Sequence, residues 1–181
     1  LKVLLEEQHA LPLISIGVWY RVGSKDDPAG LEGISRLAQE LTYRGSKTIP
    51  GPLGLKALEE AGGHWASYTL RDQSCFLATV PKQSIGEILK LEAARMSMDA
   101  FSSEEVRKEK DILQDRDLGL RDDPKQVLDF EVSVTAFRSN PYRWPTEGLV
   151  DSVQKISSEQ VWQHYSRYYV PNNAILVVVG D

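Results

Sequence analysis

The chain has 181 residues, a length that predicts one domain with a core of ordinary size. Hydrophobic residues at 41% and charged residues at 26% are usual for a globular protein. A net charge of −5 without a Lys/Arg run argues against a nucleic-acid binder, and no apolar stretch approaches the ~20 residues of a membrane-spanning helix. The single cysteine excludes an internal disulfide.

The first part of the chain predicts two strands and two helices. Residues 1–7 and 12–22 are expected to be strands of a hairpin, followed by a loop of turn-forming residues at 23–30. A helix is predicted to begin near Gly33, because apolar residues recur on one face of it, at Ile34, Leu37, Ala38 and Leu41. A second helix over 53–61 should stop at Gly62-Gly63.

The rest of the chain predicts a second hairpin, a helical middle and a closing strand. The hairpin spans 64–69 and 73–80, and helices are expected over 86–99, 104–118, from Pro124 onward, and over 159–168. A strand over 174–181 ends the chain. Strands at both ends around a helical middle indicate an α+β fold, an antiparallel sheet with helices packed on one face. Because the chain begins and ends in strand-like sequence, we expect it to be part of a longer one, in which a leader peptide could precede it.

The helix near Gly33 resembles the motif helix of the pitrilysin-type (M16) zinc peptidases, which carries His-x-x-Glu-His and a Lys/Arg-Gly-Ser/Thr exit. The exit is kept as Arg44-Gly45-Ser46, whereas Arg36, Gln39 and Glu40 stand where the family has His, Glu and His. The resemblance continues through the blocks 62–72, 140–148 and 169–174. It implies one half of an M16 (metallohydrolase LuxS/MPP-like) two-domain unit, a single N-terminal-type domain over residues 1–181 that is truncated at both ends.

The resemblance also identifies a third ligand position and a substrate strand. In the family a later helix delivers a glutamate to the zinc, and matching the run that starts at Glu109 places Arg116 at that position. Asp115 is the alternative ligand if the register is shifted by one residue. The family's edge strand, typically Gly-x-x-Asn-Ala-x-Thr, holds substrate by backbone pairing. It corresponds to a stretch whose substrate-strand candidates are Ala66, Ser67, Tyr68 and Thr69.

The residue types at these positions are not those of a catalytic zinc site. Such a site needs three His, Cys or carboxylate ligands, an open position for water and a carboxylate base. Arg36 and Arg116 are permanently cationic, and Gln39 offers no basic carboxylate. We therefore expect no catalytic residue, no metal and no cofactor, although active relatives use zinc.

The other residues with metal-binding or nucleophilic chemistry are isolated in the sequence. We expect His9, His64 and His164 to be surface or hydrogen-bonded structural residues, with His64 on the strand beside the altered site. Cys75 is expected to be a small buried hydrophobe.

Loss of zinc leaves a polar space that must be neutralised or hydrated. Arg36 and Glu40 are one helical turn apart and can pair. Arg116 and Glu109 arrive from the other helix and can reach them. The sequence therefore predicts an arginine–carboxylate cluster in place of the metal.

The resemblance implies two functions of different classes. In the first, the chain is a non-catalytic M16 domain that binds peptide or partners an active zinc metallopeptidase, like the non-catalytic subunit of the mitochondrial processing peptidase, the bc1 core proteins and inactive bacterial partners. In the second, it is part of a zinc metalloendopeptidase whose His-x-x-Glu-His site lies in another half or subunit. A purely structural domain without peptide contact is a third alternative.

The expected partners follow from these alternatives. They are a homologous M16 subunit or the second half of the same chain, and a peptide, with no nucleic acid and no membrane segment in this stretch. The bacterial periplasm, the cytoplasm and the mitochondrion stay open as locations.

Overall fold

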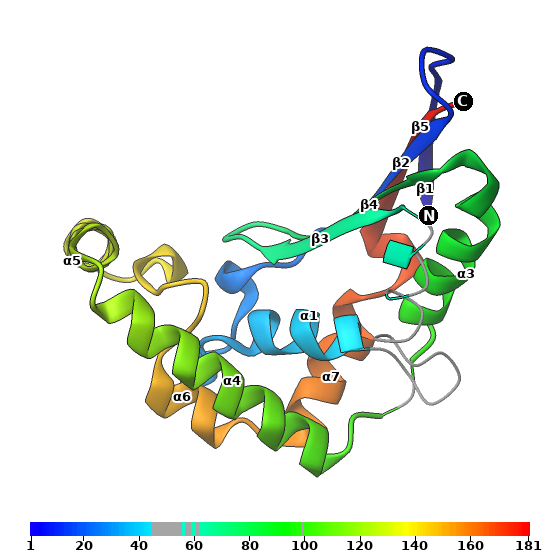
Figure 1. Cartoon of the computed structure of the whole chain (residues 1–181). Helices are drawn as coiled ribbons and strands as arrows, with labels where there is room; N and C mark the ends of the chain where they lie inside the picture. Colours follow the sequence, from blue (N-terminus) through cyan, green and yellow to red (C-terminus); the bar gives the residue numbers. More distant parts are fainter. Residues whose placement is uncertain (45–55, 57–58, 61, 99) are drawn as a thin grey trace.

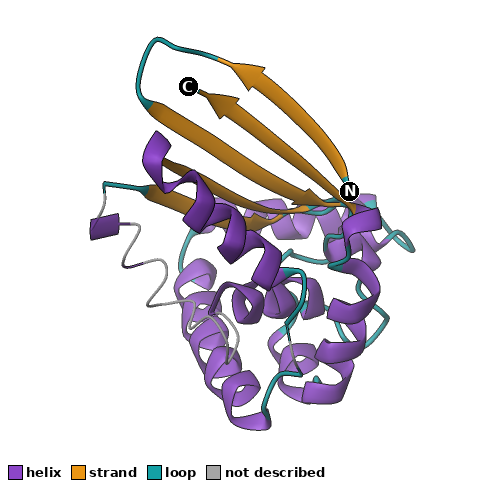
Figure 2. Cartoon of the chain, turned by 90° about the vertical axis from the view of Figure 1, so that its right-hand side faces the viewer, coloured by secondary structure: helices purple, strands orange, loops and turns teal. Residues whose placement is uncertain are grey.

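The computed structural model describes residues 1–44, 56, 59–60, 62–98 and 100–181, without the side chains of Arg44 and of residues 116–121. Most of the predicted helix over 53–61, and the Gly45-Ser46 exit, lie outside the described residues. Within them, a five-stranded sheet carries helices on one face, as expected for an α+β fold (Figure 2). No helix in this part of the chain is long and apolar enough to cross a membrane.

The strand order of the sheet is β1-β5-β2-β4-β3. The strands are β1 (Lys2–Glu7), β2 (Leu13–Tyr20), β3 (His64–Thr69), β4 (Ser74–Pro81) and β5 (Ala174–Gly180). β1 runs parallel to β5 and the other pairs are antiparallel, so the sheet is mixed rather than antiparallel throughout.

The predicted hairpin of the first two strands is wrong, because β5 lies between β1 and β2. The apolar run of β5 favours an interior position with a neighbour on each side, and the chain between β1 and β2 leaves room for it. The hairpin of β3 and β4 is confirmed, with Ser67 opposite Phe76.

The helices lie on one side of the sheet (Figure 1). They are α1 (Ile34–Arg44), α3 (Ile85–Arg95), α4 (Ser103–Arg121), α5 (Pro124–Ala136), α6 (Val150–Lys155) and α7 (Ser158–Tyr168). Helix α1 packs against β3, and α4 packs against α1 on the side away from the sheet. Single 3-10 turns occur at η1 (Ser24–Asp26), η2 (Lys82–Ser84), η3 (Pro141–Arg143) and η4 (Pro171–Asn173). Helix α6 escaped prediction because six residues are too few to show a helical period.

Helix α1 is the centre of the core. It contacts α4, α7 and β3, and its predicted apolar face is buried, with Leu37 and Ala38 fully inaccessible. Alternate residues of β2 point down onto the helices, and Val18 and Tyr20 are buried there at 1% and 0% exposure. The polar residues of α1 that face β3 and α4 are therefore held between the sheet and α4.

The N-terminal end of α1 is fixed by close backbone packing. Gly33 and Gly148 have φ angles of +100° and +82°, a region that side chains rarely adopt. A Cβ atom on Gly148 would lie 2.2 Å from the carbonyl oxygen of Glu32. Glu32 also accepts hydrogen bonds from the Ser152 hydroxyl and from the Gly30 amide, the latter at 2.9 Å. These contacts join the loop before α6 to the start of α1.

We expect Gly148→Ala to lower the free energy of unfolding by at least about 2 kcal/mol, because the new Cβ adds backbone strain to a collision. Gly86→Ala is the matched control, since Gly86 lies in α3 with no atom within 4 Å of the added Cβ. That change should stabilise by about 0.5–1 kcal/mol. Urea unfolding of both variants measures the difference, and equal effects would contradict this account.

Candidate functional site

A chain of polar contacts joins α1 to the edge strand β3. Arg36 Nη2 lies 2.5 Å from Glu40 Oε1, so the pair predicted from their spacing is present. Arg36 Nη1 donates to Gln39 Oε1 at 3.0 Å, and Gln39 Nε2 donates to Ser67 Oγ at 2.8 Å. Gln39 is fully buried, and the side chains of Arg36 and Glu40 are only 19% and 11% exposed. Arg36, Gln39 and Glu40, the residues predicted at the family's zinc-motif positions, thus form an internal polar bridge to β3.

The residues at these positions do not fit a zinc ion. Arg36 is cationic and repels a dication, and both ends of the Gln39 amide are engaged in hydrogen bonds. Within the described residues, no group of three His, Cys, Asp or Glu side chains is placed to hold a metal ion. We therefore derive no hydrolytic step through a metal at this site.

The second part of the predicted cluster lies on α4, which packs against α1. Glu109 is fully buried there, and Asp115 is exposed. Arg116 lies on α4, but its side chain is outside those that the structure describes. Its role in the cluster, and its equivalence to the third ligand, stay predictions.

The substrate-strand candidates lie on β3, at an edge of the described sheet. Ser67 and Thr69 point down toward the helices, where Thr69 Oγ1 lies 3.2 Å from Ser74 Oγ, and Ala66 is exposed on the opposite face. Tyr68 is half-buried and shares that face with Cys75, its partner on β4. The buried position of Cys75 agrees with the prediction from sequence.

The backbone of β3 presents hydrogen-bonding groups to the open edge. The Leu70 amide donates to the Gln73 carbonyl at 2.7 Å, which makes these two residues a hydrogen-bonded pair at the end of the hairpin. Because such pairs alternate along antiparallel strands, the amides of Trp65, Ser67 and Thr69 point away from β4. None of the described strands pairs with them there.

Two contacts that hold β3 were not predicted from the sequence. One is the Gln39–Ser67 hydrogen bond, which could have been found because the resemblance placed both residues beside the same lost metal. The other is Trp65, whose ring centroid lies 4.3 Å from that of Tyr43 and whose indole nitrogen donates to Glu59 at 2.8 Å. No pattern in the sequence points to this second contact.

A groove of about 340 Å³ lies beyond the end of β3, between the β3–β4 turn and α5. Its charged lining residues have both signs, since they include Arg71 as well as Asp129 and Glu147. Arg71 donates to Ser133 Oγ at 3.0 Å, and its guanidinium carbon lies 5.7 Å from the centre of the Tyr142 ring. The groove can therefore accept polar or charged groups.

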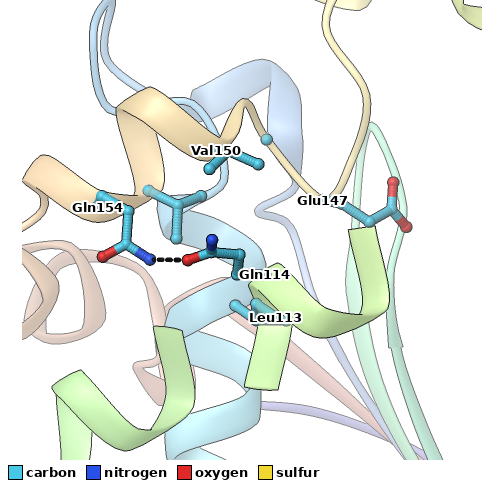
Figure 3. A pocket seen from close by; sticks show the side chains of 7 residues that line it. Leu113, Gln114, Glu147, Val150 and Gln154 are labelled. Atoms are coloured by element: carbon cyan, nitrogen blue, oxygen red, sulfur yellow. Dashed lines mark hydrogen bonds between the residues drawn. The ribbon is translucent and has the colours of Figure 1, made fainter. Parts of the chain in front are cut away.

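A second hollow lies between α4 and α6, where Gln154 donates to Gln114 at 2.9 Å (Figure 3). Its volume is about 10 Å³, enough for no more than one water molecule. This hollow is a gap in packing rather than a ligand site.

The buried His164 on α7 meets the motif helix at Ser35. Ser35 Oγ donates to the Gly23 carbonyl at 3.0 Å, so the 2.9 Å contact with His164 Nε2 is donated by the ring. Burial lowers the pKa of His164 to about 4, which keeps the ring neutral. Ser35 is fully buried with its proton committed to the backbone, so these two residues are structural rather than a nucleophile and base. His9 and His64 are exposed.

Asp27 holds the same end of α1. Its carboxylate accepts from the Gly33 amide at 2.7 Å and from the Ser35 amide at 3.1 Å, which satisfies amides at the helix start. Burial raises the pKa of Asp27 to about 7 despite these bonds. Because the pKa of this carboxylate is raised in the folded state, Asp27 lowers the free energy of unfolding as the pH rises toward that pKa. This pH dependence is opposite in sign to that of His164.

We expect His164 to make the fold sensitive to acid. Its pKa falls from 6.5 when unfolded to about 4 when folded, so the unfolded chain takes up the proton first as the pH drops. Stability from this group is complete above pH 6.5 and is lost toward pH 4, a change of about 3 kcal/mol. The measurement is the free energy of unfolding at several pH values for the wild type and His164→Gln. Asp27 is common to both proteins, so their difference isolates the histidine; parallel curves would contradict the prediction.

Comparison with known proteins places these features in one family. The sequence model described as Insulinase (Peptidase family M16) matches residues 2–148. Subunit 1 of the mitochondrial cytochrome b-c1 complex of Bos taurus is 25% identical over 178 residues, covering 96% of this chain and 36% of that protein. The zinc protease PqqE of Helicobacter pylori is 26% identical over 170 residues, 93% of this chain and 38% of that protein.

Solved structures give the same fold. A protease from Helicobacter pylori superposes with a TM-score of 0.91 at 25% identity, over 98% of this chain and 43% of that one. An inactive M16 peptidase domain from Pseudomonas fluorescens superposes with a TM-score of 0.88 at 18% identity, over 99% of this chain and 44% of that one. The chain thus spans about two-fifths of the length of these relatives.

Proposed function

The chain belongs to the insulinase family of peptidases, M16, and we propose that it is a member that binds peptide, or partners an active peptidase, without cleaving. The Arg36–Gln39–Ser67 bridge carries this proposal. It places a permanent cation and an engaged amide where peptide hydrolysis by a zinc enzyme requires ligands and a base. Inactive members occur in the family, since the domain from Pseudomonas fluorescens is named inactive.

Peptide binding is supported by the state of β3. In the described sheet the strand has no neighbour along one edge, where three amides point outward, and an extended peptide could add to it as a further strand. The groove of about 340 Å³ continues from the end of β3 and could accept side chains of such a peptide. Loss of the metal chemistry leaves this binding surface in place.

A partner unit is supported by the other face of the sheet. Helices cover only one face in the described part of the molecule (Figure 2). On the uncovered face, a hollow of about 380 Å³ is lined in part by Leu4, Trp19, Ile175 and Val177. Uncovered apolar surface of this kind is typical of an interface, and the second M16 half or subunit is our proposed occupant. If the same protein carries His-x-x-Glu-His outside this stretch, it is instead one half of an active zinc peptidase.

We predict that the purified chain holds far less than one zinc per molecule and cleaves no peptide. Elemental analysis by mass spectrometry after chelator-free purification measures the metal. A quadruple variant, Arg36→His with Gln39→Glu, Glu40→His and Arg116→Glu, is the positive control and should gain zinc affinity because it restores the family ligand set. About one tightly held zinc in the wild type would overturn the proposal.

We also predict that an extended peptide slows hydrogen exchange at the outward amides of β3. The probe is a synthetic peptide of alternating threonine and valine with lysine at its ends, and exchange is followed by NMR. Saturating peptide should slow exchange at Trp65, Ser67 and Thr69 by roughly tenfold or more, because pairing worth about 1.4 kcal/mol changes an equilibrium by that factor.

The opposite edge of the sheet supplies the internal control for this experiment. Strand β1 likewise has no neighbour along one side among the strands that the structure describes, and its exposed residues include Leu4 and Leu5 at 45% and 75%. Protection confined to β3 supports the proposal. Equal protection of β1 and β3 would indicate indiscriminate edge pairing, and unchanged exchange at β3 would exclude peptide binding by this route for the probe.

A further inference from the structure

We propose that Gln39, at the position of the family's general base, is a positioning residue that holds β3 ready to pair with peptide without a metal. The inference rests on the proposed function and adds to it the side chain that prepares the strand. Gln39 is fully buried and its hydrogen bond to Ser67 spans from the centre of α1 to the centre of β3.

Ser67 binds α1 through its side chain and offers its backbone amide to the edge of β3 that an added strand would use. Its side chain points down to α1 and accepts from Gln39 at 2.8 Å. Its amide points to the edge of β3 away from β4, because Ser67 and Phe76 are a non-hydrogen-bonded pair that lies between hydrogen-bonded pairs of the two strands. Fixing this side chain therefore fixes the orientation of a backbone group that an added strand would use.

The orientation of the Gln39 amide is dictated by its neighbours. An arginine can only donate hydrogen bonds, so Arg36 selects the oxygen of Gln39 and leaves its nitrogen for Ser67. Arg36 is in turn held by Glu40 at 2.5 Å. Arg36 thus donates both to Glu40 and to Gln39, and Gln39 donates in turn to Ser67, so the polar contacts run without a break from the helix to the strand.

The middle of β3 has need of such an anchor. As an edge strand it pairs with β4 alone among the described strands, and edge elements open most easily. Trp65 holds the beginning of the strand through Tyr43 and Glu59, and Thr69 holds its end through Ser74. The Gln39–Ser67 bond holds the segment between them.

The test is hydrogen exchange of the unliganded chain, read by NMR at amides that point to β4. Gln39→Leu keeps the approximate size of the side chain but removes the bond. Exchange at Ala66 and Tyr68 should accelerate about five- to tenfold, the loss expected for one buried hydrogen bond. Exchange at the centre of β2, at Ile16 and Val18, should stay unchanged.

Two further variants separate positioning from general stability. Gln39→Glu can accept from both Arg36 and the Ser67 hydroxyl, so it should return exchange at β3 to within about twofold of the wild type. Ser67→Ala removes the partner from the half-buried strand instead, and serves if Gln39→Leu does not fold. Equal acceleration in all strands, or no acceleration at Ala66 and Tyr68, would overturn the inference.

The same variants keep this inference distinct from the proposed function. Exchange of the chain alone reports the anchor whether or not any peptide binds. With the threonine–valine peptide as probe, Gln39→Leu should weaken the protection of Ser67 by the same five- to tenfold if the anchor serves binding. If Gln39→Leu accelerates exchange in the free chain but the peptide protects β3 in neither protein, the proposed peptide binding is refuted. Gln39 would then hold β3 in place without preparing it for a peptide, so this result would also overturn the inference.

Discussion

The apolar face of α1 is buried between the sheet and the helices α4 and α7, and the site depends on that burial. Leu37 and Ala38 on this face are completely inaccessible, so the helix cannot rotate or slide without opening the core. Its polar residues are consequently delivered to one place, the junction with β3 and α4. Packing of α1 thus determines where Arg36, Gln39 and Glu40 lie, and the hydrogen-bonding capacity of these side chains determines which contacts they make.

The guanidinium of Arg36 connects the helix to the strand in a different way from a metal ion. A zinc ion draws several ligands to one point, whereas a guanidinium is flat and donates along fixed directions. Arg36 accordingly lies along α1, and the described contacts connect it to β3 through Gln39. A buried arrangement of this kind stabilises little over apolar packing, but it selects one arrangement of its members, because a broken link strands a charge.

Much of the fold followed from the sequence because its signals are local. The apolar period of α1, the turn between β3 and β4 and the spacing of Arg36 and Glu40 each concern residues a few positions apart. The pairing of β1 with β5 did not follow, because nothing near Leu4 or Leu5 specifies a partner at the other end of the chain. The Gln39–Ser67 bond and the Trp65–Tyr43 contact likewise require the packing of α1 on β3, which sequence spacing does not encode.

The place of β1 in the sheet has a consequence for how the chain folds. Its only strand neighbour in the described sheet is β5, and His9 just after β1 meets Asp181 across 172 residues of sequence. Loop closure over such a separation is slow, and contacts of this kind lower folding rates. During synthesis β1 leaves the ribosome before β5, and it cannot pair with β5 until the residues between the two strands have been translated. The apolar residues of β1 therefore stay without their strand partner while the residues between β1 and β5 are translated, and unpaired apolar strands of this kind are prone to aggregation.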